Sequence, residues 1–148
     1  MTLIEVMVSI LLITIVVVAA LGARYIGVKQ ARRADAYNTA GRLGLLLLEG
    51  WRSTGMHSAY DPVTRFSGQM TITDGASGPG APTDLAFTLN NTSYHIVQDN
   101  VNYYATLAYN DETTMAPAVL HVTVAFRHTY GEGTISETDN LVQLRTYD

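Results

Sequence analysis

Cysteine is absent from this 148-residue chain, and proline occurs only four times. Without cysteine the fold cannot contain a disulfide, so it must close by packing and hydrogen bonds alone. No proline lies within the first 52 residues, so no helix breaker interrupts that stretch. A continuous helix over residues 1–52 would be about 78 Å long, at 1.5 Å per residue. The sequence therefore predicts a long N-terminal helix ahead of the rest of the chain.

The motifs that carry catalytic or cofactor chemistry are also missing. The sequence contains no phosphate-binding loop, nucleophile elbow or dinucleotide-binding glycine pattern. Net charge is −4 with the acidic residues scattered, a pattern that offers no footprint for nucleic acid. We therefore predict no enzyme activity, no cofactor, no metal site and no nucleic-acid partner. The four histidines never occur at metal-ligand spacing: His57, His95, His121 and His128.

The first 27 residues form an apolar helix candidate interrupted by one carboxylate, Glu5, with Arg24 near its end. Such a run is long enough to span a membrane. A carboxylate at the centre of a spanning helix costs roughly 2.5–3.5 kcal/mol, and near the helix end it still needs a partner. Residues 6–23 offer no cation, so the nearest positive charge is the α-amino group of Met1, on the same chain or on a neighbouring copy. We therefore predict a membrane helix that packs against copies of itself, with Met1 and Glu5 as assembly residues.

Thr2-Leu3-Ile4-Glu5-Val6, followed by the apolar run, resembles the mature N-terminus of type IV pilins and of type II secretion pseudopilins. The resemblance is close over about the first 30 residues and extends to the remainder only by layout. It implies that a prepilin peptidase removes a leader and methylates the amine of Met1. It also implies that Glu5 meets a neighbour's N-terminus during assembly.

Two features depart from the common family pattern and leave the subgroup open. Most members begin with Phe where this chain has Met1, and many have a helix-kinking Pro where it has Gly22. Met1 is interpreted either as the cleaved N-terminus or as the initiator of a trimmed sequence. Some pseudopilins hold calcium in a C-terminal loop, but the acidic residues there lack the spacing of an EF-hand, so we expect solvated carboxylates. These residues are Glu132, Glu137 and Asp139.

The resemblance predicts a structural subunit of a bacterial type IV pilus, located in the inner membrane before assembly and in an extracellular filament afterwards. Its partners would be copies of itself, the membrane, the prepilin peptidase, an inner-membrane platform protein and an assembly ATPase. One alternative is a minor pilin, or a pseudopilin in a periplasmic pseudopilus. A more distant alternative is a monomeric binding module held by a plain membrane anchor. Replacing Glu5 by Ala would distinguish them, because only assembly depends on that carboxylate.

Residues 1–27 are predicted to form the membrane and assembly helix, and residues 28–148 the head. Gly22 and Gly27 bracket the membrane exit, where we expect local melting of the helix in a packed filament. The basic residues beyond that exit form either the flank of an anchor or a surface that meets a neighbouring subunit. If the head lies outside the membrane, basic residues that served as the flank of an anchor would violate the positive-inside rule. This violation favours the inter-subunit surface over the flank. A solvated face is the remaining alternative. The basic residues are Arg24, Lys29, Arg32 and Arg33.

The rest of the head is predicted to be α+β, with the C-terminal half of the helix packed on an antiparallel sheet. Apolar residues recur at spacings of three or four along the helix and define its buried face: Ala36, Ala40, Leu43, Leu47 and Trp51. Four consecutive leucines at 45–48 extend around the helix, which predicts burial on two sides. Residues 53–69 and 74–84 are predicted loops. Strands are predicted at 70–73, 85–89, 94–98, 101–109, 118–128 and 141–147. In the strand at 118–128, apolar and polar residues alternate, which predicts a half-buried strand with His121 on its polar face.

Overall fold

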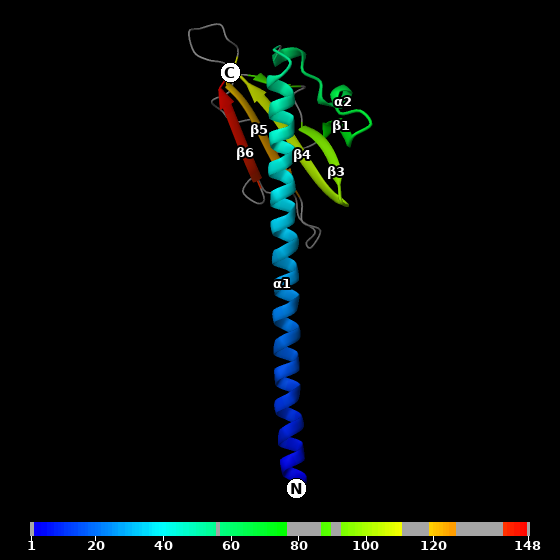
Figure 1. Ribbon diagram of the computed structural model, residues 1–148, viewed down its shortest axis with the longest axis vertical. Helices are drawn as coiled ribbons and strands as arrows, with labels where there is room; N and C mark the ends of the chain where they lie inside the picture. Colours follow the sequence, from blue (N-terminus) through cyan, green and yellow to red (C-terminus); the bar gives the residue numbers. More distant parts are fainter. Residues whose placement is uncertain are drawn as a thin grey trace. The chain divides into compact units, whose positions relative to one another are not determined.

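The computed structural model describes residues 2–55, 57–76, 87–89, 93–110, 119–126 and 141–147. The chain divides into two compact units, Met1–Asp35 and Ala36–Asp148. The first unit is helical from Leu3 onward, and the second combines helix with sheet (Figure 1). Helix α1 (Leu3–Arg52) is unbroken and contributes to both units, which confirms the predicted N-terminal helix of about 50 residues. The predicted boundary between residues 27 and 28 was based on where the apolar run ends, whereas the division after Asp35 is based on contacts within the fold. The predicted boundary therefore stays a prediction.

The second unit is built on an antiparallel sheet. Its strand order is β1-β3-β4-β5-β6, and the short β2 pairs with the end of β4. This arrangement confirms the predicted α+β class and places the strands close to the predicted ranges. The strands are β1 (Thr71–Ala76), β2 (Phe87–Thr88), β3 (Ser93–Gln98), β4 (Val101–Tyr109), β5 (Val119–Phe126) and β6 (Leu141–Tyr147).

Residues with positive φ occur at the turn between β3 and β4 and at an irregularity within β1. Asp99 and Asn100 join β3 to β4 with φ of 51° and 61°, the left-handed pair that a two-residue type I′ turn requires. Strand β1 runs further than predicted, to Ala76, because Gly75 with φ of 85° sits at an irregularity in the pairing with β3. The first three residues of the predicted loop 74–84 are therefore strand, and its remainder lies outside the described residues.

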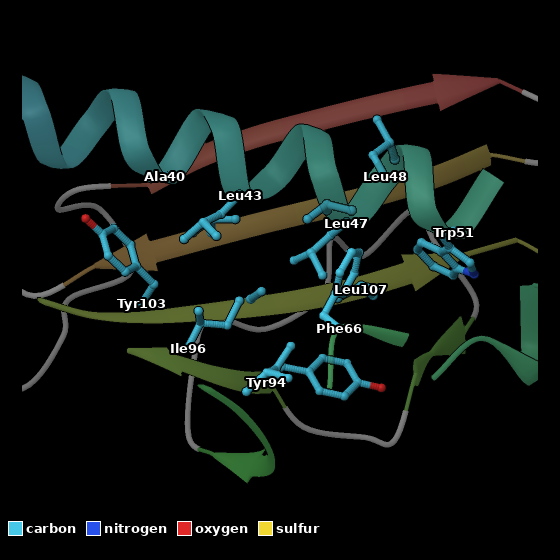
Figure 2. Close-up of a cluster of buried hydrophobic side chains, with 14 of the residues drawn as sticks. Ala40, Leu43, Leu47, Leu48, Trp51, Phe66, Tyr94, Ile96, Tyr103 and Leu107 are labelled. Carbon is cyan, nitrogen blue, oxygen red and sulfur yellow. The ribbon is translucent and has the colours of Figure 1, made fainter. Parts of the chain in front are cut away.

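The C-terminal part of α1 lies against one face of the sheet. All five residues of the predicted buried face are at most 6% exposed, so the helical period identified the contact correctly. Figure 2 shows Leu43 and Leu47 directed toward the strands that carry Tyr103, Ile96 and Leu107. Gly44 permits this approach, because a Cβ there would lie 2.6 Å from Cδ1 of Leu144.

The four leucines of residues 45–48 are divided between two environments. Leu47 and Leu48 are buried against the sheet, whereas Leu45 and Leu46 are 50% and 37% exposed. The sheet therefore accounts for one side of the predicted two-sided burial. Burial of the other side by neighbouring helices stays a prediction.

The prediction that β5 is half-buried was wrong. Alternate residues of β5 do point to opposite faces, but both faces are covered, and His121 and Thr123 are only 3% and 2% exposed. Hydrogen bonds satisfy the buried polar side chains. Within β5, Thr123 Oγ1 lies 3.3 Å from His121 Nδ1, and on the neighbouring strands the hydroxyls of Ser93 in β3 and Thr106 in β4 bond to each other. His121 is consequently a core residue rather than the surface or partly covered histidine that its place on the polar face predicts.

The connection predicted as a loop over 53–69 is partly structured. It contains a 3-10 helix at His57–Ala59 and helix α2 (Pro62–Arg65), whose N-cap Asp61 accepts a hydrogen bond from the Val63 N–H at 3.0 Å. Two of its aromatic residues, Tyr60 and Phe66, belong to the core at 3% and 7% exposed. The prediction failed because isolated aromatic residues in a short stretch produce no periodic pattern.

Tyr60 fixes this connection to the end of α1. Its ring stacks on Trp51 with centroids 5.9 Å apart, and its hydroxyl donates to the Leu47 carbonyl at 3.2 Å. Burial raises the pKa of Tyr60 to about 12, opposed by the nearby Arg65 charge and assisted by Asp61. The neutral phenol that the hydrogen bond needs is therefore stable throughout the physiological pH range.

Candidate functional site

The first unit carries a continuous apolar surface that nothing in the described chain covers. Every described residue from Thr2 to Asp35 is exposed. By length and composition α1 qualifies as a membrane-spanning helix, and none of its most apolar window is buried within the chain. The large apolar side chains on this surface range from 42% exposed for Val6 to 82% for Leu3. Exposed surface of this kind needs a non-aqueous or protein environment.

Glu5 lies in the first turn of α1 and finds a partner within its own chain. The Thr2 backbone N–H donates to Glu5 Oε2 at 3.4 Å, and the Glu5 N–H donates to the Thr2 carbonyl at 3.0 Å. Thr2 is thus positioned as the N-cap and Glu5 as the third helical residue, the spacing of a capping box. A carboxylate at this end of a helix is also favoured by the helix dipole. The Thr-x-x-Glu spacing of residues 2–5 is the signal in the sequence that predicts this cap.

The capping contact leaves most of the acceptor capacity of Glu5 unused. A distance of 3.4 Å is long for an N–H···O bond, and an ionised carboxylate offers about four acceptor positions. The side chain is exposed, so a second chain can reach it. Met1, the predicted source of the cation, lies outside the described residues, and its role stays a prediction.

Two hydroxyls inside the apolar run are satisfied locally. Ser9 Oγ donates to the Glu5 carbonyl and Thr14 Oγ1 to the Ile10 carbonyl, each at 2.8 Å. These bonds within the helix allow both side chains to enter an apolar environment without an unpaired polar group. The apolar surface is therefore compatible with a bilayer or with tightly packed neighbouring helices, despite its serine and threonine.

Gly22 and Gly27, the predicted sites of helix melting, lie inside unbroken helix. A Cβ at either position would meet no atom within 4 Å, so neither glycine is required by packing inside the chain. Their predicted role concerns the packed filament and stays a prediction. The four basic residues that follow Gly22 are all exposed on the same helix: Arg24, Lys29, Arg32 and Arg33.

The head brings together no cluster of side chains suited to metal binding among the residues that the structure describes. No cluster of three or more His, Cys, Asp or Glu side chains occurs there. His95 stacks on Tyr104 with centroids 5.1 Å apart, and its Nε2 lies 3.0 Å from Asn102 Oδ1, so its contacts are structural. The side chain of His57 and all of His128 lie outside the described residues, as do the acidic residues considered for calcium.

Comparison with known proteins identified no similar protein. No family model matches the chain, and neither the curated proteins nor the solved structures contain a significant match. The structure itself has a pilin-like layout, in which a long N-terminal apolar helix continues into a segment packed on an antiparallel sheet.

Proposed function

We propose that this chain is a structural subunit of a bacterial type IV pilus, which polymerises through its N-terminal helix into an extracellular filament. The observation that carries the proposal is the exposed apolar surface of residues 3–28, with one carboxylate in its first turn. A chain free in water would not keep this surface exposed. A bilayer before assembly and neighbouring helices after assembly would each cover it.

Assembly in this proposal moves the helix from lipid into protein. Burial of apolar surface is worth roughly 25 cal/mol per Å² relative to water, but lipid already supplies an apolar environment. Extraction from the inner membrane must therefore be driven, which is the task assigned to the assembly ATPase and the platform protein. Head-to-tail contacts that do not close then extend the filament, because each added subunit presents the same surface again.

Glu5 supplies specificity in this mechanism. Its carboxylate would pair with the Met1 amine of a neighbouring subunit, methylated by the prepilin peptidase, and so fix the register between helices. The weak contact with the Thr2 N–H leaves it free to accept from that amine. Gly22 and Gly27 would let the helix melt locally in the packed fibre and so allow it to stretch.

A minor pilin, or a pseudopilin of a periplasmic secretion piston, would share this surface and this mechanism. The monomeric binding module is a different class, and one observation favours it. The capping box gives Glu5 a role in starting the helix, which requires no neighbouring copy.

Variants at two positions separate these functions. Glu5→Gln keeps an acceptor for the Thr2 N–H but removes the charge, and Glu5→Ala removes both. Thr2→Ala replaces a preferred N-cap residue but keeps both backbone contacts with Glu5. Removing one partner of a buried ion pair costs about 3–5 kcal/mol, so both Glu5 variants should abolish filaments. Thr2→Ala should cost about 1 kcal/mol of helix stability and preserve assembly.

The measurement is the yield of filaments sheared from producing cells, with the subunit quantified in the membrane fraction. Glu49→Gln is the matched control, because Glu49 is an exposed carboxylate on the same helix. Wild-type filament yield for Glu5→Gln, with loss for Glu5→Ala, would assign Glu5 to capping and contradict the assembly role.

A further inference from the structure

Of the four basic residues that follow the apolar run, Arg33 has an interaction within the chain, and the other three have none among the described residues. Arg24, Lys29 and Arg32 are exposed and make no hydrogen bond or ion pair with described residues. Asp35 is the first acidic residue after Glu5, so no carboxylate is interleaved among them. We name residues 24–33 the basic segment.

The length of the apolar run determines where the basic segment would lie in a bilayer. Residues 3–23 of α1 extend about 31 Å at 1.5 Å per residue, which matches a hydrocarbon core of about 30 Å. Arg24 and the 64% exposed Tyr25 would then sit at the boundary of the hydrocarbon, where aromatic rings are favoured and a long basic side chain can extend to the headgroups. Arg33, about 14 Å further along the helix, would lie just beyond the headgroups, within reach of its long side chain.

The charges are also gathered around the helix axis. At 3.6 residues per turn the four basic positions occupy about one half of the circumference, and the other half carries Ile26, Gln30 and Ala34. Asp35, two residues beyond the segment, lies on the basic half. A half-cylinder of positive charge presents several donors to one dense array of anions. Phosphate groups at a lipid surface form such an array.

The acidic residues of a neighbouring copy fit this surface less well. Those described in the chain are separated from one another in sequence, and the three on α1 are 14 or more residues apart. The described acidic residues are Glu5, Asp35, Glu49, Asp61, Asp74 and Asp99. No described part of a second copy therefore has a matching acidic run.

We propose that the basic segment binds the phosphate groups of anionic phospholipids while the subunit is in the membrane. The inference rests on the proposed membrane-inserted precursor, and it names the lipid partner of that state. Extraction of a subunit would then have to break these contacts, so the anionic lipid content of the membrane would control how readily subunits enter a filament.

The test uses the full chain in micelles of an uncharged detergent, titrated with phosphatidylglycerol or with phosphatidylcholine. Backbone amide resonances of residues 24–33 report binding. Each basic residue near an anionic surface is worth roughly fivefold in affinity, so incomplete additivity over four residues gives a preference for phosphatidylglycerol on the order of 100-fold. The preference should shrink as salt rises toward about 1 M. Equal affinity for the two lipids, or resonances that do not move, would contradict the proposal.

Paired variants separate the segment from overall charge. Lys29→Gln with Arg32→Gln should reduce the lipid preference at least about tenfold, since two contacts are removed. Arg42→Gln with Arg52→Gln is the control, because it changes the charge equally at two exposed positions of the same helix. An equal reduction in the control would show a general charge effect and overturn the assignment. Inorganic phosphate should leave the resonances unmoved, and binding as tight as that of the lipid would identify a free-anion site instead.

The lipid titration requires no filament, so it fails or succeeds independently of the proposed function. Filament loss in Glu5→Gln with an unchanged lipid preference would support both proposals. A wild-type chain that prefers phosphatidylglycerol but never enters a filament would support the lipid site and refute the pilus subunit. A Lys29→Gln and Arg32→Gln chain that keeps the wild-type preference but no longer assembles would make the segment an inter-subunit surface, and the lipid proposal would be wrong.

Discussion

One helix serves two regions of this molecule, and its side chains meet opposite conditions in them. In the first unit, residues 2–35, all described side chains of α1 are exposed, whether apolar or charged. In the second unit the same helix buries Leu47 and Trp51 completely against the sheet. The second region buries a core within one chain, whereas no described residue covers the first. Under the proposed function, stability of the head and assembly through the first unit should therefore be separable properties.

The same substitution at a buried and at an exposed leucine tests this separation most strongly. Leu47→Ala removes a side chain that is 0% exposed and should cost about 2–5 kcal/mol of the free energy of unfolding. Leu11→Ala, at a position 61% exposed, should change the stability of the head by less than about 0.5 kcal/mol. Denaturant unfolding in detergent, followed by fluorescence of the single tryptophan, measures both. Equal losses would show that the two regions fold as one unit.

Two glycines of α1 sharpen the comparison between packed and open surface. A Cβ at Gly50 would lie 2.8 Å from the Tyr60 hydroxyl and 3.1 Å from Phe66 Cζ, so Gly50→Ala should destabilise the head by about 1–3 kcal/mol. A Cβ at Gly41 would meet nothing within 4 Å, so Gly41→Ala should stabilise the helix by up to about 1 kcal/mol. Thermal unfolding followed by circular dichroism would detect the opposite signs. An increase in stability for Gly50→Ala would contradict this expectation and would show that Tyr60 and Phe66 can move to accommodate the methyl group.

Alkaline pH tests whether the packing around Tyr60 contributes to stability. Its pKa is about 12 in the folded chain and about 10 when unfolded, so ionisation favours the unfolded state. This contribution is complete below pH 10 and is lost as pH rises from about 10 to 12. Burial also raises the pKa of Tyr103, so both residues contribute in this range. Tyr60→Phe should reduce the slope of unfolding free energy against pH between 10 and 12, and an unchanged slope would show that Tyr60 ionises freely.

The smallest expected effect is at the turn between β3 and β4. Asn100 has a φ of 61°, so Asn100→Gly should stabilise the head by a few tenths of a kcal/mol, because glycine adopts this conformation without steric cost. Asn38→Gly on an exposed turn of α1 should instead destabilise, since glycine weakens a helix. Differential scanning calorimetry can resolve both shifts. Destabilisation by Asn100→Gly would indicate that the asparagine side chain makes a contact worth more than the strain.

Patterns with a regular period predicted most of the fold. The spacing of Ala36, Ala40 and Leu43 identified the face of α1 that packs on the sheet, and alternation located the strands within a few residues. The burial of His121 could not be predicted, because it depends on coverage of the second face and on a hydrogen bond to Thr123. Tyr60 was missed because its partners, Trp51 and the Leu47 carbonyl, are nine and 13 residues away.

For the candidate site, the sequence located Glu5 but identified only one of its two environments. The requirement for a cation follows from placing a carboxylate in an apolar run, and that requirement indicated a neighbouring chain. The structure adds a local hydrogen bond from Thr2, which depends on the helix beginning at Leu3. Sequence reasoning on charge alone does not include this capping contribution.

Cryo-electron microscopy of filaments sheared from producing cells would test the central claim most directly, that the first unit completes itself only with copies of the same chain. We predict filaments of this subunit in which residues 3–28 are buried against neighbouring helices and the Glu5 carboxylate contacts a neighbour's Met1 amine. Filaments that lack this chain, with the chain remaining monomeric in the membrane, would contradict the account.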